Sequence, residues 1–389
     1  MRAILASMAL VITATTATAQ CGGSFSSFVS GLKSEARSQG HSASTVDKFF
    51  ANVRHDPKVI RADRSQGVFQ KDFLTFSRAL ISQNRMTHGR NNAAKYASVF
   101  NRMQREYGVT PGVLLAFWAF ETDFGANQGN FNTLNALATL SHDCRRPDLF
   151  RPQVFAALEL YERGAFSPTG TKGAWAGEIG MIQMLPEDII RNGVDADGNG
   201  RVDLQTSPAD ALMTGARMLS QMGWRPNEPW LQEVVVPSNL DWTNTGLDKT
   251  LTVQQWANMG VRGRSQDLFG RNTKASILLP MGRKGPAFIA YPNFHVYFEW
   301  NKSFVYVSTA AYFATRLMGA PVYDAGNPEP GLKGDEMKAL QTRLRQRGHD
   351  VGKIDGILGA LTRAAVQKEQ QRLGMPADAW PTRALLNKL

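Results

Sequence analysis

The sequence lacks a long apolar run after its first residues and lacks any nucleic-acid-binding motif. A helix needs about 20 consecutive apolar residues to span a bilayer, so no transmembrane helix is expected in the mature chain. Cysteine is scarce, with two among 389 residues. The 33 acidic residues are outnumbered by 44 Lys and Arg, which leaves a formal net charge of +11. This charge favours anionic partners, although a basic surface can also serve solubility alone.

The N-terminus has the features of a secretory signal. Arg2 precedes an apolar run over residues 3–12, and small residues lead to Ala19. The small residues predict cleavage after Ala19, and the apolar run is too short to span a membrane. A lipid anchor on Cys21 is the weaker alternative, because Gln20 fits poorly just before an acylated cysteine. The mature protein then works outside the cytoplasm, where an anionic cell-wall polymer or a membrane surface is a better partner than nucleic acid.

The two cysteines allow one disulfide. In an oxidising compartment we expect Cys21 to pair with Cys144 and to fix the mature N-terminus to a segment near the middle of the chain. A second interpretation makes Cys144 a nucleophile with His142 as its base. The even cysteine count favours the bridge, which needs fewer assumptions.

Residues 110–125 predict one capped helix. Thr110 suits the N-cap, Pro111 the first helical position and Gly125 the C-terminal stop. Apolar residues recur on one stripe with spacing i, i+3 and i+4: Leu114, Phe117 and Trp118. The next position of this stripe is occupied by Glu121.

Glu121 is an acid where the helical pattern calls for an apolar residue. Burial beside Phe117 and Trp118 disfavours the charged carboxylate and raises the pKa, so the side chain can donate a proton near neutral pH. The alternative is a glutamate at the end of a helix that faces solvent or pairs with an arginine. A buried acid is often catalytic but can also be structural, so the stripe alone leaves both interpretations open.

The expected fold is mainly α. Residues 24–107 follow a helical pattern, with one stripe over 25–32 and another, behind a Ser44 cap, over 46–53. Further helices are expected over residues 69–81, 132–140, 153–163, 208–223 and 304–318. Strand-like runs at residues 233–236, 276–279 and 287–291 predict a small antiparallel element inserted into the helical protein.

Composition divides the chain into domains. Residues 323–331 have the Pro, Gly and polar composition of a linker. We therefore expect a signal over residues 1–19, a main domain over 20–322 and a small domain over 332–389, which is large enough to fold alone. Helices of the small domain are expected near residues 336–347, 360–373 and 382–389.

Residues 195–203, DADGNGRVD, match the opening of an EF-hand loop. Oxygen-bearing side chains at its first, third and fifth places, Asp195, Asp197 and Asn199, are suited to wrap a hard cation. The twelfth place is Thr206 rather than glutamate, so the missing carboxylate would come from Asp210. Alternatively, Asp210 caps the helix that starts after Ser207, and the Asp-Gly turns hold no ion.

Three other polar residues allow two interpretations each. Arg145 and Arg146 stand together near Cys144, either as solvated turn residues or as carboxylate binders on the rim of a cleft. Gln183 lies in an apolar, glycine-containing segment over residues 173–184. Because a buried amide needs partners, Gln183 is either satisfied internally or offered to a ligand.

With these residues identified, the chain resembles the lytic murein transglycosylases of the B type, a glycoside hydrolase family. Four segments occur in the order of that family: FWAFETDFG, LNALATLSHDCRRPDLF, GAWAGEIGMIQMLP and the Asp/Gly loop followed by SPADAL. The C-terminal unit, with LQTRLRQRGHDVGKIDGILGALTRAAVQKEQ, resembles the type 1 peptidoglycan-binding domain. The resemblance implies a lysozyme-like helical catalytic core with a small antiparallel element, and a small three-helix C-terminal domain.

The resemblance implies that Glu121 is the single catalytic acid. In this family one glutamate protonates the glycosidic oxygen between N-acetylmuramic acid and N-acetylglucosamine. The muramoyl C6 hydroxyl then closes a 1,6-anhydro ring, and the glutamate takes up the hydroxyl proton. The scheme departs from the usual two-carboxylate mechanism. It agrees with the lack of an obvious second acid near Glu121, because Asp123 is two places on and should face away.

The resemblance also implies roles in substrate binding and metal binding for other residues of this chain. The resemblance implies that Gln183, the pair Arg145 and Arg146, and Asn301 contact substrate, the arginines through its carboxylates. It also implies a structural Ca²⁺ site, with these ligands: Asp195, Asp197, Asn199, the Arg201 carbonyl and Asp210. Three residues depart from the more polar or tyrosine residues expected in the family: Ala174, Met181 and Met218.

The resulting hypothesis is a periplasmic lytic transglycosylase that acts on peptidoglycan strands and needs no cofactor for catalysis. Its C-terminal domain would tether it to the wall, and proteins of cell-wall synthesis or remodelling are the class of further partners. Two alternatives remain: a hydrolytic muramidase, and a wall-binding protein without activity.

Overall fold

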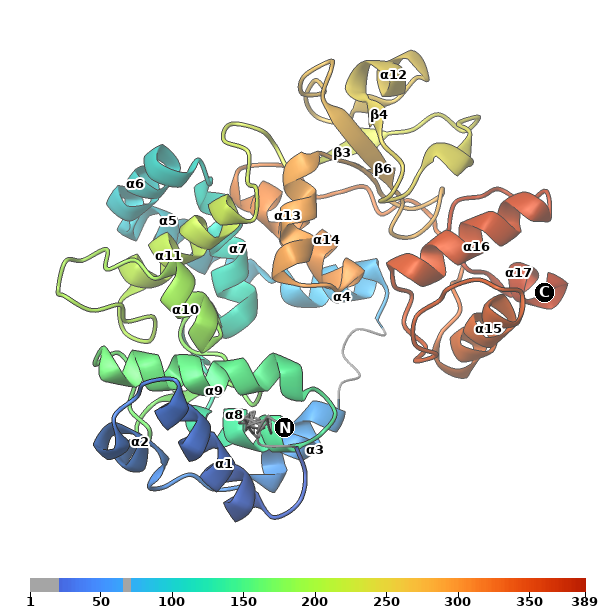
Figure 1. The fold of residues 1–389 in the computed structure, drawn as a ribbon. Helices are drawn as coiled ribbons and strands as arrows, with labels where there is room; N and C mark the ends of the chain where they lie inside the picture. Colours follow the sequence, from blue (N-terminus) through green and yellow to red (C-terminus); the bar gives the residue numbers. More distant parts are fainter. Residues whose placement is uncertain (1–20, 66–70) are drawn as a thin grey trace, which may run out of the picture.

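The computed structural model describes residues 21–65 and 71–389. The expected signal over residues 1–19 lies outside the described residues. The described chain is mainly helical, with small antiparallel sheets (Figure 1). The expected fold class is therefore confirmed.

A group of five helices forms one end of the molecule. The early helices α1 (Phe25–Ser38), α2 (Ala43–Phe50) and α3 (Pro57–Arg64) pack on the later helices α8 (Thr133–His142) and α9 (Pro147–Glu162). The predicted disulfide joins the two parts of this group, because Cys21 is bonded to Cys144 with their Cα atoms 5.2 Å apart. The bridge excludes the alternative in which Cys144 is a free nucleophile.

Helix α7 (Pro111–Thr122) is the centre of the helical core. It packs against α14 (Phe304–Leu317), α5 (Gln83–Lys95) and α11 (Pro208–Gln221). Other helices complete this part: α4 (Phe73–Leu80), α6 (Ala97–Tyr107), α10 (Pro186–Asn192) and α13 (Pro292–Trp300). Nine of the 12 residues of α7 are buried, so the helix is enclosed on several sides and not only along the predicted stripe.

The predicted antiparallel element is a five-stranded sheet in the order β4-β6-β7-β3-β5. Its strands are β3 (Leu231–Val235), β4 (Leu251–Thr252), β5 (Arg262–Gly263), β6 (Lys274–Leu278) and β7 (Ala287–Ala290). The short helices η2 (Trp242–Asn244) and α12 (Val253–Asn258) accompany it. A separate two-stranded sheet pairs β1 (Phe131–Asn132) with β2 (Lys172–Gly173) and contacts α8.

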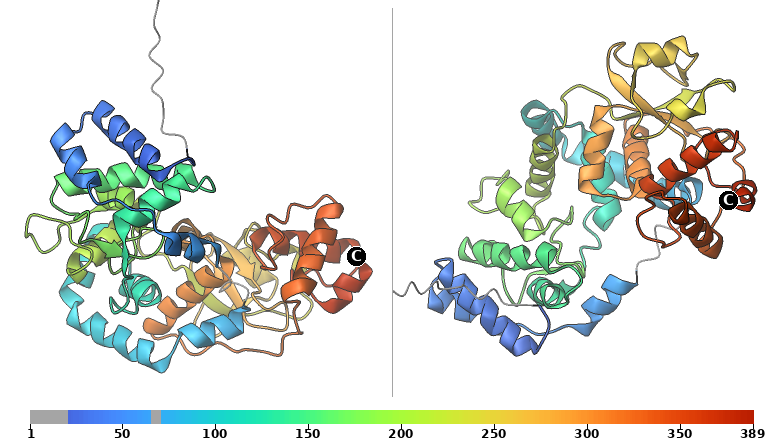
Figure 2. Two further views of the ribbon diagram at one scale, coloured as in Figure 1. Left: turned by 90° about the horizontal axis from the view of Figure 1, so that it is seen from below. Right: turned by 45° about the vertical axis from the view of Figure 1, so that its right-hand side comes forward.

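The C-terminal unit contains α15 (Gly334–Gln346), α16 (Ala360–Arg372) and α17 (Arg383–Lys388), each close to its predicted range. Figure 2 shows this unit and α1–α3 at opposite ends of the molecule. Residues 323–331 have no regular secondary structure but are tied to the main domain. Tyr323 is hydrogen-bonded to Ser77 at 2.9 Å, and the Asn327 N–H donates to the Lys284 carbonyl at 2.8 Å.

Three predicted helix boundaries were wrong. Helix α2 is capped by Ser42 rather than Ser44, because the Ser42 hydroxyl accepts a hydrogen bond from the Thr45 N–H. Helix α9 begins at Pro147 and contains Pro152, although proline usually marks a boundary. Helix α7 ends at Thr122, because the chain is already left-handed at residues 123 and 124, before Gly125. The predicted start of α4 at residue 69 lies outside the described residues.

Among the described residues, no helix is both long enough and apolar enough to cross a membrane.

Candidate active site

Glu121 lies in the last turn of α7 and is only partly exposed. One turn earlier, the Phe117 ring stacks on the indole of Trp300, with ring centroids 4.3 Å apart and planes 18° from parallel. The stack directs the indole N–H of Trp300 to Glu121 Oε1 at 3.2 Å. An aromatic residue of the α7 core therefore positions a hydrogen-bond donor for the acid.

Tyr306 supplies a second donor to the same oxygen. Its hydroxyl donates a short hydrogen bond to Glu121 Oε1. Tyr306 lies in the first turn of α14, where the Ser303 hydroxyl caps the helix by accepting from the Tyr306 N–H. Because α14 packs along α7, the capped end of one helix meets the acid at the end of the other.

These surroundings set the protonation state of Glu121. Burial disfavours the charged carboxylate and raises its pKa from 4.5 to about 7, against the opposing effect of the hydrogen bonds from Tyr306 and Trp300. The negative charge of Glu178 raises the pKa further. A carboxyl with a pKa near neutral can both donate and accept a proton at the pH of the cell.

Glu178 is a second acid whose charge acts on Glu121, although no second acid near Glu121 was obvious from the sequence. Its backbone closes a turn in which the Ala174 N–H donates to the Glu178 carbonyl at 3.0 Å. Its Oε2 atom is buried and has no hydrogen-bond partner among the described residues. Burial raises the pKa of Glu178, opposed in part by the positive charge of Arg146. The site thus holds two carboxyls whose pKa values are both raised by burial.

Asp123 points into a different environment, as expected. It is the C-cap of α7, with a φ of 53°, and pairs with Arg85 at 2.9 Å. The neighbouring Thr122 hydroxyl donates to the Met181 carbonyl at 2.6 Å. The end of α7 is therefore fixed to the segment that contains Gln183.

The side-chain amide nitrogen of Gln183 forms hydrogen bonds inside the protein. The Nε2 atom donates to the Gly180 carbonyl at 2.8 Å and to the Gln128 carbonyl at 3.2 Å. The residue has a φ of 53°, in the left-handed region that few side chains adopt. These contacts agree with the interpretation in which the amide nitrogen is satisfied inside the protein. The role of Gln183 in substrate binding stays a prediction.

Arg145 and Arg146 converge on one buried carboxylate. Arg145 Nη1 donates to Asp63 Oδ2 at 2.6 Å, and Arg146 Nη2 donates to Asp63 Oδ1. The Asp63 side chain is 1% exposed, whereas the two arginine side chains are 40% and 35% exposed. One function of the pair is to neutralise Asp63, and contact with substrate carboxylates stays a prediction.

Asn301 follows Trp300 directly. Its Oδ1 accepts a hydrogen bond from the Ser303 N–H at 2.9 Å. The bond shapes the turn between α13 and α14, which holds Trp300 at one end and Tyr306 near the other. Asn301 therefore supports the two donors to Glu121 in this structure, and its contact with substrate stays a prediction.

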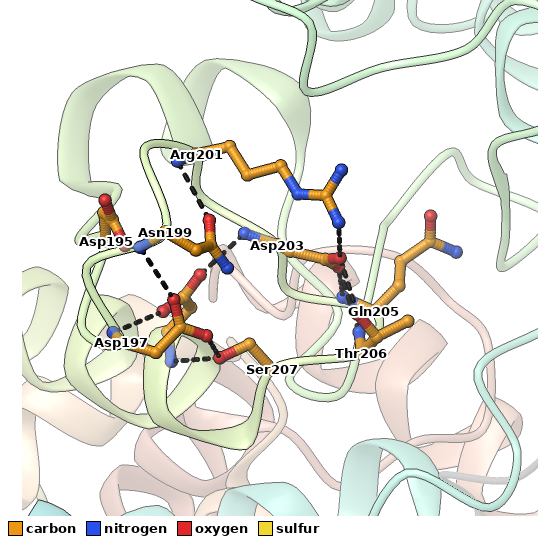
Figure 3. A network of polar contacts seen from close by, with 9 residues as sticks. Asp195, Asp197, Asn199, Arg201, Asp203, Gln205, Thr206 and Ser207 are labelled. Atoms are coloured by element: carbon orange, nitrogen blue, oxygen red, sulfur yellow. Dashed lines mark hydrogen bonds and ion pairs between the residues drawn. The ribbon is translucent and has the colours of Figure 1, made fainter.

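The acidic loop gathers the predicted metal ligands (Figure 3). Carboxylate oxygens of Asp195, Asp197 and Asp210 lie within 4.8 Å of one another. Asp210 is fully buried and accepts from the Ala196 N–H at 2.8 Å. Asn199 Oδ1 accepts from the Arg201 N–H at 3.1 Å, so the loop curls around its polar side chains. Three converging carboxylates form a donor set that suits Ca²⁺.

Sequence reasoning missed three residues around Glu121: Trp300, Tyr306 and Glu178. Trp300 and Tyr306 lie in a segment rich in aromatic residues, but this composition does not indicate that either one faces Glu121. Glu178 stood inside the quoted segment GAWAGEIGMIQMLP, but nothing in its spacing pointed to Glu121.

Comparison with known proteins gives a consistent result for both parts of the chain. Residues 24–315 match the transglycosylase SLT domain, and residues 333–389 match a putative peptidoglycan binding domain. The chain is similar to the solved structure of SltB3 from Pseudomonas aeruginosa in complex with NAG-anhNAM-pentapeptide. The two are 34% identical with a TM-score of 0.86, over 94% of this chain and 99% of that one.

Two further relatives cover less of the chain. Membrane-bound lytic murein transglycosylase B of Escherichia coli (strain K12) is 27% identical over 235 residues, which span 59% of this chain and 63% of the relative. Slt35 of Escherichia coli in complex with calcium is 23% identical with a TM-score of 0.65, over 77% of this chain and 96% of that one. At that identity the likeness to Slt35 shows the fold alone.

Proposed function

Because the chain belongs to the transglycosylase SLT domain family, we propose that it is a peptidoglycan lytic transglycosylase with Glu121 as its only acid–base catalyst. The bond cleaved is the β-1,4 bond between N-acetylmuramic acid and N-acetylglucosamine, and the product has a 1,6-anhydromuramoyl end. The observation that supports the proposal is the geometry at Glu121: Trp300 and Tyr306 both donate to one carboxylate oxygen of an acid whose pKa is raised by burial to about 7.

In the first half of the reaction, protonated Glu121 gives its proton to the glycosidic oxygen as the bond from that oxygen to muramoyl C1 breaks. Trp300 and Tyr306 both donate to Oε1, so Oε2 is the oxygen that delivers the proton. Their hydrogen bonds then stabilise the carboxylate that forms. Hydrogen bonds to a charged group are worth about 1.5–3 kcal/mol, so this stabilisation affects the barrier directly.

In the second half, the muramoyl C6 oxygen bonds to C1 and its proton passes to the Glu121 carboxylate. The glutamate is thereby returned to its starting state, and no water is consumed. The 2-acetamido group of the substrate steadies the cationic transition state. Glu178 contributes by its charge, which favours the protonated form of Glu121 before the first step.

The acidic loop is proposed to hold a structural Ca²⁺. Its ligands would be the carboxylates of Asp195, Asp197 and Asp210, with the Asn199 side chain and the Arg201 carbonyl completing the shell. The ion would neutralise three acids that lie within 4.8 Å of one another, and would thus stabilise the fold. It takes no part in the chemistry.

We place the protein in the periplasm, where its substrate lies, after removal of a signal over residues 1–19. The C-terminal unit would hold the enzyme on the wall, and proteins of cell-wall synthesis or remodelling are its expected further partners. The family match of that unit and the basic charge of the chain, +11, support binding to an anionic polymer.

Product analysis tests the proposed reaction. Purified sacculi are digested with the full mature chain, and the released fragments are analysed by mass spectrometry before and after borohydride reduction. Anhydro ends resist reduction and are one water lighter than reducing ends. Reducing muramic acid ends would identify a muramidase, and the absence of released fragments would identify a wall-binding protein.

A further inference from the structure

The C-terminal unit is docked on the main domain through hydrogen bonds to the backbone of that domain. Gln367 Nε2 of α16 donates to the Thr245 carbonyl at 2.7 Å. The segment before α17 adds a second contact, because Asp378 Oδ2 accepts from the Arg283 N–H at 3.0 Å. Since both partners in the main domain are backbone groups, these bonds fix the position of α16 relative to that domain.

Arg363 of α16 joins two parts of the main domain. Its Nη1 and Nη2 atoms donate to the carbonyls of Leu279 and Pro280, at 3.3 and 2.7 Å, just after β6. Its guanidinium carbon lies 4.5 Å from the centre of the Phe304 ring. Burial lowers the pKa of Arg363 to about 10, so the side chain stays charged near neutral pH. Because a cation is attracted to an aromatic face, Arg363 holds Phe304 beside the segment that follows β6.

Phe304 is the first residue of α14 and is buried. Tyr306 follows two positions later, so the two side chains point to roughly opposite sides of the helix, about 200° apart. On one side Phe304 contacts Arg363, and on the other side the Tyr306 hydroxyl donates to Glu121 Oε1. The first turn of α14 is therefore held between the C-terminal unit and the catalytic acid.

Within the main domain, local contacts hold the start of α14. Phe304 packs on Phe298 of α13, with ring centroids 6.3 Å apart. Lys302 pairs with Glu299, but both side chains are mostly exposed, and exposed ion pairs contribute little. Because the first turn of a helix lacks some of its intrahelical hydrogen bonds, its position depends on caps and side-chain packing. The contact from Arg363 supplies such packing from outside the main domain.

We propose that Arg363 is a positioning residue of the active site. By holding Phe304, it fixes the first turn of α14 and so keeps the Tyr306 hydroxyl on the Glu121 carboxylate. The inference rests on the proposed function, in which Glu121 transfers the proton. The C-terminal unit then supports catalysis on every substrate, including short soluble strands that need no attachment to the wall.

The pKa of Glu121 tests this assignment without substrate. Full mature chains labelled at the glutamate carboxyl carbons are titrated by NMR, with Glu121→Gln identifying the resonance. Arg363→Met keeps an apolar stem and removes the charge and the donors. Because the hydrogen bond from Tyr306 lowers the pKa of Glu121, its weakening in Arg363→Met should raise that pKa, in the same direction as Tyr306→Phe. Arg343→Met, which loses a hydrogen bond to the Leu386 carbonyl inside the C-terminal unit, is the matched control and should leave the pKa unchanged.

Turnover of short soluble glycan strands provides the second measurement. Arg363→Met should lower kcat about tenfold with little change in KM, because the sugar contacts stay in place. The alkaline limit of activity should move to higher pH. Phe304→Leu, which removes the ring and keeps an apolar side chain, should act in the same direction. In a Tyr306→Phe background, Arg363→Met should have little further effect, because the hydroxyl that it positions is gone.

A wild-type Glu121 pKa and a wild-type kcat in both Arg363→Met and Phe304→Leu would overturn the assignment. An Arg363→Met effect of the same size in the Tyr306→Phe background would also overturn it, because Arg363 would then act by its charge or through general stability. Reducing ends formed by the wild-type chain would instead refute the proposed transglycosylase reaction, and the NMR titration would still decide the role of Arg363.

Discussion

The Tyr306 hydroxyl donates a hydrogen bond to the Glu121 carboxylate across 185 residues of sequence. The bond joins the first turn of α14 to the last turn of α7, the two helices that form the centre of the core. It stabilises the charged form of an acid that burial otherwise keeps protonated. The balance between these opposing effects gives Glu121 a pKa suited to both halves of the proposed reaction.

Tyr306→Phe removes this donor and keeps the ring. We expect the pKa of Glu121 to rise, because the lost bond favours the carboxylate. The alkaline limit of activity should then move to higher pH, and kcat should fall about ten- to hundredfold, as for the loss of 1.5–3 kcal/mol. The pH profile of anhydro-product release measures both. Tyr161→Phe on α9 is the control, and a Tyr306→Phe profile identical to it would remove Tyr306 from the mechanism.

Glu178→Gln should shift the same profile in the opposite direction. The substitution removes a negative charge that raises the pKa of Glu121, so the carboxyl loses its proton at lower pH. The alkaline limit of activity should move to lower pH while products remain anhydro. An unchanged alkaline limit would show that the two acids do not interact.

The raised pKa of Glu121 also predicts how stability depends on pH. The folded pKa, about 7, lies above the usual 4.5, so the folded state holds a proton that the unfolded state releases. Stability due to this group is therefore present below pH 4.5 and is lost as pH rises through 7. Glu121→Gln should stabilise the protein at pH 8, by at most about 3 kcal/mol, and have little effect at pH 4.

Urea unfolding at the two pH values measures this difference. Glu106→Gln, at an exposed position of α6, is the matched control. A Glu121→Gln variant that is no more stable than wild type at pH 8 would contradict the buried, proton-holding state of the acid.

Calcium should stabilise the fold without changing the chemistry. At a concentration 100 times Kd, binding to the folded state adds about 2.7 kcal/mol, which raises Tm. Asp197→Asn should reduce this rise in Tm, whereas Asp335→Asn, at a fully exposed acid of α15, should not. Thermal melts with calcium and with excess chelator provide the measurement, and equal Tm values for wild type in both would argue against the site.

The sequence predicted the local features of this molecule well and its long-range contacts poorly. Helix α7, the three longest strands and the acidic loop have periodic or turn signals within a few residues, and the disulfide follows from a cysteine count of two. The family resemblance, confirmed by matches over residues 24–315 and 333–389, identified the catalytic candidate.

Local sequence patterns could not predict which distant residues tertiary packing brings together. Nothing near Tyr306 or Trp300 in sequence indicates that both face Glu121. Likewise, no local signal shows that Arg145 and Arg146 share the buried Asp63, which lies 82 and 83 residues earlier. These contacts depend on how α3, α7 and α14 pack, which a single sequence does not reveal.

The most direct test of the central claim is the rate at which Glu121→Gln forms anhydro ends on purified sacculi. Asp123→Asn, which changes a carboxylate two positions away that pairs with Arg85, is the matched control. We predict that Glu121→Gln loses at least about a hundredfold in rate and still binds sacculi, while Asp123→Asn releases the same anhydro products as wild type. Anhydro ends formed by Glu121→Gln at the wild-type rate would show that another group transfers the proton.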